Sequence, residues 1–182
     1  YVAGAQIDPV EKKPFNHFLP GSEVLTFGML GCNFHCEFCQ NWHSSQAMRD
    51  SCAKAGLESI QPVSAEDLVE FALNHKAGSI ASSYNEPLIT SEWAVEVFQV
   101  ARARGLKTAM VSNGFATRET LEFVRPWLDA LKIDLKSMRE DQYRRMGGRL
   151  RPVLDTIKYA VELGLWVEVV TLVIPNFNDA NE

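Results

Sequence analysis

The sequence lacks several features that mark common functional classes. It has no apolar run of membrane-spanning length, because the most apolar stretch, residues 166–174, is interrupted by Glu168 and predicts a buried strand. No stretch resembles a secretory signal peptide. There is no basic excess either, since 18 Lys and Arg stand against 23 Asp and Glu, a formal net charge of −5. We therefore expect neither a membrane nor a nucleic acid as partner.

Cysteine is scarce, and the four residues present do not suggest a disulfide framework. Cys32, Cys36 and Cys39 lie within eight residues, whereas Cys52 stands alone in a polar segment and is interpreted as an incidental loop thiol. In a chain without export signals, clustered thiols are typical of metal binding or catalysis in a reducing compartment. We therefore expect a cytoplasmic protein.

The glycine-rich motif of dinucleotide-binding sheets is absent, because no Gly-x-Gly-x-x-Gly follows the first predicted strand. Apolar runs instead alternate with amphipathic segments. Strands are predicted over residues 24–30, 80–83, 108–111, 130–135 and 166–174, and helices over 64–77, 91–104, 117–128 and 152–163. This alternation predicts right-handed βαβ units and a parallel sheet, either in a β/α barrel or in an open doubly wound sheet.

The ends of the chain set the expected domain limits. Residues 1–22 contain three prolines and no periodicity, so they predict an irregular lead-in. Residues 24–174 show no internal linker, so residues 23–182 are predicted to form one domain. The chain starts without Met and closes on residues typical of a helix start. We therefore expect a fragment that lacks the last strand of this domain.

The three clustered cysteines are the strongest chemical signal. Thiolates suit iron–sulfur clusters or zinc. A [4Fe–4S] cluster held by three cysteines keeps one iron open for a substrate or cofactor. A zinc site completed by His35 or His43 is an alternative, although zinc motifs usually pair their ligands at two separated places. An electron-transfer cluster is another alternative and would need a fourth ligand such as Cys52.

Polar residues follow the other predicted strands. Asn85 and Glu86 follow the second strand, Asn113 follows the third, and Asp134 and Lys136 end the fourth. Because the carboxyl ends of parallel strands meet at one edge of a β/α fold, these residues and the cysteines should converge on one mouth. Simpler interpretations are a helix-entry carboxylate for Glu86, a turn residue for Asn113 and a surface ion pair for Asp134 with Lys136.

The cysteine spacing resembles a known signature. Cys32-x3-Cys36-x-Phe38-Cys39 is similar to the C-x3-C-x-aromatic-C motif of the radical S-adenosylmethionine (SAM) superfamily. Further segments resemble one branch, the AmmeMemoRadiSam-system radical SAM proteins, which are relatives of pyruvate formate-lyase activating enzyme. These segments are residues 8–14, 39–42, 45–47, 84–87, 112–114, 134–136 and 171–175.

The resemblance implies both a fold and a set of cofactors. The fold would be an incomplete (β/α)6 barrel, a partial TIM barrel of the radical SAM type, with about five parallel strands in this chain. Cys32, Cys36 and Cys39 would hold a [4Fe–4S] cluster. The residues expected to contact SAM are Phe38, Cys39, Gln40, Asn85, Glu86, Asn113, Asp134, Leu135 and Lys136.

Two of these implied contacts carry charge. Glu86 would receive the α-ammonium of SAM, and Lys136 would meet its carboxylate. Relatives have Gly-Gly-Glu where this chain has Tyr84-Asn85-Glu86, so the carboxylate is kept and the two glycines are replaced. Val111 stands where activating-enzyme relatives have an Asp that helps to hold a monovalent cation, so that cation site is not carried over.

The implied activity is reductive cleavage of SAM to methionine and a 5′-deoxyadenosyl radical that abstracts hydrogen from a substrate. A glycyl-radical-enzyme activase is the main specific hypothesis. It implies an electron donor such as flavodoxin or ferredoxin, and a protein or small-molecule substrate. A non-catalytic iron–sulfur electron-transfer module and a zinc-stabilised scaffold that docks partner proteins stay open as alternatives.

Overall fold

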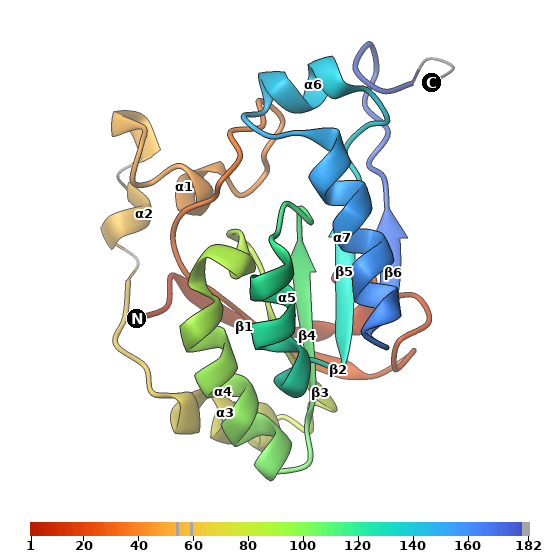
Figure 1. Cartoon of the computed structure of the whole chain (residues 1–182). Coiled ribbons are helices and arrows are strands. Elements are labelled where there is room, and N and C mark those ends of the chain that lie inside the picture. The colour runs from red at the N-terminus through yellow and green to blue at the C-terminus, as the bar shows by residue number, and fades with distance from the viewer. Residues whose placement is uncertain (54, 59, 180–182) are drawn as a thin grey trace.

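A computed structural model describes residues 1–53, 55–58 and 60–179. Its strands form one sheet, in which they lie side by side in the order of the sequence (Figure 1). Its strands are β1 (Gly4–Pro9), β2 (Glu23–Gly28), β3 (Ser79–Ser82), β4 (Lys107–Ser112), β5 (Ala130–Asp134) and β6 (Trp166–Val170). β1 runs antiparallel to β2, and every other neighbouring pair is parallel. Among the described residues β1 and β6 do not pair, so the barrel is open on one side.

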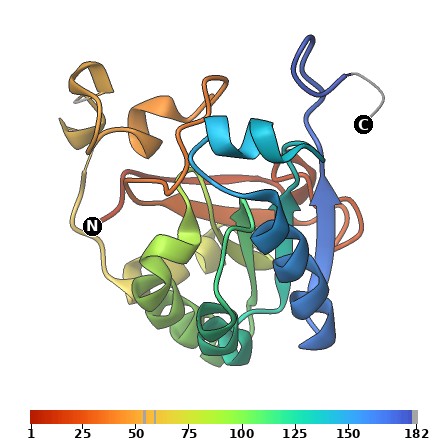
Figure 2. The same cartoon turned by 45° about the horizontal axis from the view of Figure 1, so that its top comes forward.

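Helices connect the parallel strands, and α3 (Ala65–Asn74), α4 (Ser91–Ala103), α5 (Arg118–Val124) and α7 (Leu150–Glu162) cover one face of the sheet, as Figures 1 and 2 show. The short helices α1 (Trp42–Ser45), α2 (Ala55–Glu58) and α6 (Glu140–Arg145) lie toward the carboxyl ends of the strands in Figure 1. Short 3-10 helices span Val10–Lys12, Ser51–Ala53, Pro87–Thr90 and Arg125–Trp127. No helix in the described part of the chain has the length and apolarity to cross a membrane.

The main core lies between the sheet and these helices. Because side chains alternate along a strand, every second residue points to the helical side. Leu25, Phe27 and Ile80 from β2 and β3 are fully buried there, as are Leu131 and Ile133 from β5. The chain begins α3 with a capping box, in which Ser64 and Asp67 satisfy each other's backbone N–H groups.

The opposite face of the sheet is called the inner face below. Residues 10–22 of the lead-in pack against it. Val10, Phe15 and Phe18 are buried against small inner-face residues such as Ala81 and Ala109. Figure 1 shows this red segment passing close to β6. The apolar side chains of the lead-in fill the space that alanines leave open, so residues 10–22 complete a second small core.

The lead-in therefore corrects the expectation of an irregular segment. Residues 4–9 form β1, and Ile7 packs against the main core. A single antiparallel edge strand needs no helical crossover. With three prolines nearby, its short apolar pattern was too weak to predict a strand.

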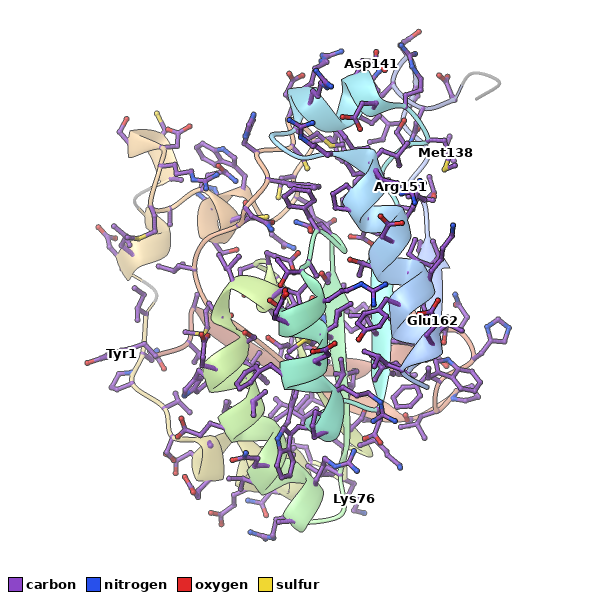
Figure 3. All side chains as sticks on the ribbon, viewed as in Figure 1. Tyr1, Lys76, Met138, Asp141, Arg151 and Glu162 are labelled. Atoms are coloured by element: carbon purple, nitrogen blue, oxygen red, sulfur yellow. The ribbon has the colours of Figure 1, made fainter. Side chains whose placement is uncertain are left out.

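The five predicted parallel strands and four helices are confirmed, with boundary changes. The helix predicted over 117–128 ends at Val124 and continues as a 3-10 turn, since Pro126 lacks the N–H that an α-helix needs. The polar helix α6 was not predicted. Figure 3 marks the polarity of the sheet: Lys76 lies near the amino ends of the strands, and Asp141 on α6 lies near their carboxyl ends.

Candidate functional site

A pocket that opens to solvent lies at the carboxyl ends of the parallel strands. The cysteine loop after β2 supplies one wall with Cys32, Cys36 and Cys39. The loops after β3, β4 and β5 supply Asn85, Glu86, Asn113, Asp134 and Lys136. The structure thus brings together residues spread over about a hundred positions of the sequence, as the parallel topology predicts.

The cysteine loop is held in place mainly by backbone contacts. The backbone N–H of Phe34 points to Cys32 Sγ at 3.3 Å, and that of His35 donates to the carbonyl of Met146 at 2.9 Å. The Gln46 amide donates to the carbonyl of Phe34 at 2.9 Å, and this amide is itself buried. Phe34 is fully buried between Phe115 and Tyr143. The loop therefore has a fixed shape that presents its thiols to the pocket.

The chemistry of the thiols fits an iron–sulfur cluster. All three are partly buried and free. Burial raises the pKa of Cys32 and raises that of Cys36 to about 11, which favours the neutral thiols, so both would release a proton on binding iron. Cys52 is exposed and does not line the pocket. Within the described residues, no three His, Cys, Asp or Glu side chains converge closely enough to hold a single metal ion. A cluster does not require such convergence, because each cysteine binds a separate iron.

Glu86 is almost completely buried, and its carboxylate joins two strand ends. One oxygen accepts hydrogen bonds from Ser112 Oγ at 2.7 Å and from the Leu88 N–H at 3.1 Å. The other oxygen accepts from the Asn113 N–H at 2.8 Å. Burial raises the pKa of Glu86, although these hydrogen bonds act in the opposite direction. The carboxylate thus has three protein donors and keeps one acceptor position for a further donor.

The two asparagines connect the strand ends to the cysteine loop. Asn85 accepts a hydrogen bond from the Met29 N–H at 2.9 Å, just before the loop. The Asn113 amide donates to Asn33 Oδ1 at 2.7 Å and lies 3.8 Å from Cys32 Sγ. Both residues are buried polar groups whose contacts shape the pocket.

A row of charges runs along the inner face of β5. Lys136 Nζ donates to Asp134 Oδ2 at 2.8 Å, and Lys132 donates to Asp134 Oδ1. Alternation in an extended strand places all three on one side, as was predicted for Asp134 and Lys136. Lys132 was missed, although the spacing Lys-x-Asp-x-Lys was visible in the sequence.

Tyr84 lines the pocket, although the sequence did not predict it there. Its φ is +70°, a conformation that favours glycine and strains other residues. Lys13 donates to the Tyr84 hydroxyl at 3.0 Å and forms an ion pair with Asp8 at 3.0 Å. Gly28 allows the approach, because a Cβ there would lie 2.9 Å from Tyr84 Cβ. The hydrogen bond from Lys13 and the close approach that Gly28 allows therefore hold Tyr84 in a strained conformation at a position where relatives have glycine.

Three of the predicted cofactor contacts do not line the pocket. Phe38 packs edge-on against Phe177 with ring centroids 5.1 Å apart, and Gln40 is exposed. Leu135 packs against the core. Conversely, the pocket includes Asn41, Ser45, Ser83, Tyr84 and Ser112, which were not predicted. Small polar residues give little sequence signal, because turns and helix caps use them as well.

Comparison with known proteins decides the family. The family described as the Radical SAM superfamily matches residues 27–182, which include the cysteine loop and every parallel strand from the end of β2 onward. The chain belongs to the radical SAM superfamily. The predicted superfamily and fold class are thereby confirmed, and the family implies a [4Fe–4S] cluster and SAM.

Relatives of this radical SAM chain extend over nearly its whole length. An uncharacterised protein of Methanocaldococcus jannaschii is 36% identical over 178 residues, covering 98% of this chain and 51% of that protein. The pyruvate formate-lyase-activating enzyme of Clostridium pasteurianum is 24% identical, covering 90% of this chain and 66% of the enzyme. The chain thus spans about half of the first relative and about two thirds of the second.

Solved structures of radical SAM proteins share the fold. A radical SAM methyltransferase from Sphaerobacter thermophilus superposes with a TM-score of 0.57 at 15% sequence identity. The similarity covers 90% of this chain and 51% of the methyltransferase. At this identity the similarity concerns the fold alone. Together with the activating enzymes among the relatives, membership of the superfamily supports an enzyme.

Proposed function

We propose that Cys32, Cys36 and Cys39 hold a [4Fe–4S] cluster and that the adjoining pocket binds SAM at the open iron. The observation that carries this proposal is the convergence of three thiols and two charged groups, Glu86 and Lys136, on one pocket. Soft thiolates bind iron, while the charged groups match the ends of an amino acid. When bound, the cluster supplies the electron that cleaves SAM to methionine and a 5′-deoxyadenosyl radical.

The charged residues of the chain would orient the amino-acid part of SAM. The remaining acceptor position of Glu86 suits an α-ammonium group, because three donors already fix the carboxylate in place. Lys136 faces the pocket and offers an ammonium to the carboxylate of SAM. Asp134 pairs with Lys136 at 2.8 Å, and Asn113 fixes the edge of the cysteine loop. The carboxylate of Glu86, which its three donors hold in place, can therefore receive a ligand without further reorganisation.

The adenosyl part would lie beside the cysteine loop. Phe38 and Gln40 flank Cys39, and the proposal for them is contact through the backbone or after a small side-chain rotation, because neither side chain lines the pocket. For Leu135 it is limited to backbone contact for the same reason. Asn85 would act by holding the start of the cysteine loop through Met29. Tyr84 would shield the pocket from solvent on the side of the lead-in.

A glycyl-radical-enzyme activase is the specific activity we propose within the superfamily. Activating enzymes among the relatives support it, at 24% identity for the Clostridium pasteurianum enzyme. The activity requires a one-electron donor such as flavodoxin or ferredoxin and a substrate, which for an activase is a protein. Membership of the AmmeMemoRadiSam-system branch belongs to the same proposal.

Anaerobic reconstitution of the full-length protein with iron and sulfide tests the function. We expect about four irons per chain, an EPR signal after reduction that SAM changes, and formation of 5′-deoxyadenosine. Cys36→Ser should abolish all three, whereas Cys52→Ser, which alters an exposed thiol outside the pocket, should not. Uptake of zinc alone, or a reduced spectrum that is indifferent to SAM, would overturn the proposal in favour of a scaffold or an electron-transfer protein.

A further inference from the structure

Lys132 is a buried charged group that the proposed function leaves unused. Its side chain is 5% exposed, in the middle of β5 on the inner face. Burial lowers its pKa to about 8, and the nearby charge of Lys136 contributes in the same direction. A buried ammonium is unfavourable unless it is paired, so its partner indicates its role.

The partner of Lys132 is Asp134, which it shares with Lys136. Lys132 binds Oδ1, and Lys136 binds Oδ2. The neighbouring strands place Val111 and Glu168 in register with Lys132. Glu168 is already used by three backbone N–H groups of the lead-in. In the described part of the chain, Asp134 is therefore the carboxylate with which Lys132 forms an ion pair.

The two lysines differ in access to the pocket. Asp134 and Lys136 line it, whereas Lys132 does not and lies on the far side of Asp134. Two cations thus share one carboxylate, and one of the two can leave without stranding that carboxylate. An unpaired, partly buried carboxylate would otherwise resist the departure of its partner.

We propose that Lys132 is a positioning residue that keeps Asp134 paired and so frees Lys136 to bind the carboxylate of SAM. This inference rests on the proposed function, because it takes Lys136 as a SAM ligand. Without Lys132, Asp134 has Lys136 as its remaining partner and holds it back. Lys132 therefore acts through the charge balance of Asp134 and makes no contact with the cofactor.

A double-mutant cycle on SAM affinity tests the inference. In cluster-loaded full-length protein, Lys132→Met should weaken SAM binding about tenfold, which corresponds to about 1.4 kcal/mol. In the Asp134→Asn background, where no carboxylate retains Lys136, the same substitution should change the affinity less than about twofold. Lys158→Met, at an exposed lysine on α7, is the matched control and should bind SAM like the wild type.

A second readout uses the cluster-free protein. Acetylation of lysines by a limiting amount of acetic anhydride, followed by peptide mass spectrometry, reports how freely the Lys136 amine is presented. Lys132→Met should lower the acetylation of Lys136 relative to Lys158, and adding Asp134→Asn should restore it. A merely structural role for Lys132 would lower the melting temperature and leave this ratio unchanged.

The two proposals fail in different ways. If wild-type protein takes up a cluster and SAM leaves its spectrum unchanged, the proposed function fails. If the wild type binds SAM and Lys132→Met binds it equally well, only the role of Lys132 is overturned. Equal losses from Lys132→Met in both backgrounds would also overturn it, because the effect would then not pass through Asp134.

Discussion

Glu168 shows how one residue can tie distant parts of the chain together. Its carboxylate, on β6, accepts hydrogen bonds from three consecutive backbone N–H groups, those of Asn16, His17 and Phe18, at 2.8–3.2 Å. The Trp166 indole donates to it at 3.0 Å. Burial alone would raise the pKa of Glu168, but these hydrogen bonds outweigh it and hold the pKa below its ordinary value.

We predict that Glu168→Gln lowers the free energy of unfolding by about 1–3 kcal/mol, because the amide keeps one acceptor oxygen but loses the charge and the second acceptor. A carboxyl whose folded-state pKa is depressed stabilises the fold above its unfolded-state pKa. That contribution disappears as the pH falls through the folded-state value. The difference from wild type in urea unfolding should therefore be full above about pH 5 and shrink below about pH 4.

The control for this prediction is Glu162→Gln. Glu162 is an exposed residue at the end of α7, as Figure 3 shows. Its substitution should change the unfolding free energy by less than about 0.5 kcal/mol at every pH. A loss at Glu168 that does not depend on pH would mean that side-chain packing, and not the charge, explains the effect.

At this scale the sequence predicts part of the site. The thiols, Glu86, Asn113, Asp134 and Lys136 follow from strand ends, because strand polarity alone places them at the mouth. The roles of Glu168 and Lys13 could not be predicted, because the backbone N–H groups and the Tyr84 hydroxyl that they bind lie far away in the sequence. Glu168 lies 150 residues or more from the donors of the lead-in. The pairing of Lys132 with Asp134, two residues on, was visible as a spacing, but the burial that gives it a role was not.

At the scale of elements, the turn after α6 fixes the cysteine loop. A Cβ on Gly148 would overlap the ring of Phe34, and a Cβ on Gly147 would meet the His35 ring. The carbonyl of Met146, the residue before these two glycines, accepts a hydrogen bond from the His35 N–H. Because α6 is polar and has no apolar stripe, neither this helix nor its contact with the cysteine loop could be predicted from the sequence.

Gly148→Ala should therefore disturb the cluster site. We expect a loss of about 1–3 kcal/mol in unfolding free energy from overpacking, and a lower iron content after reconstitution. Gly4→Ala is the matched control, because no atom lies within 4 Å of a Cβ built there. If Gly148→Ala loads iron like Gly4→Ala, the loop does not depend on this contact.

The lead-in is a second element that contributes more to the packed core than its sequence pattern indicates. Phe15 is 1% exposed and lies 5.5 Å from Phe18 between ring centroids. We predict that Phe15→Ala lowers the unfolding free energy by about 3–5 kcal/mol. Phe123→Ala, at a ring that is 46% exposed on α5, should have a much smaller effect. Comparable losses in urea unfolding would mean that residues 10–22 are not a core element.

At the scale of the whole molecule, the sheet ends on a strand whose outer edge pairs with no other strand among the described residues. In the described residues β6 pairs with β5 alone, and Val169 is 44% exposed on it. Exposed apolar edge strands template pairing with another chain. The apolar run predicted a strand as far as residue 174, whereas β6 ends at Val170.

This 182-residue chain should therefore self-associate as its concentration rises. Val169→Lys should reduce the association, because a charge on an edge strand opposes strand pairing. Val161→Lys is the control, since that valine is 59% exposed on α7, away from the edge. Sedimentation velocity over a concentration series checks the prediction, and equal effects of the two lysines would point to net charge instead of the strand edge.

The hydrogen bonds that Glu168 accepts from residues 16–18 also connect the two edges of the open sheet. The lead-in continues directly from β1 and reaches β6, so it acts as a strap between the first and the last strand. If β1 and β6 moved apart, the lead-in would have to extend or lose its hydrogen bonds to Glu168. We therefore expect the width of the open barrel, at whose mouth we propose that SAM binds, to depend on a carboxylate that lies outside the pocket.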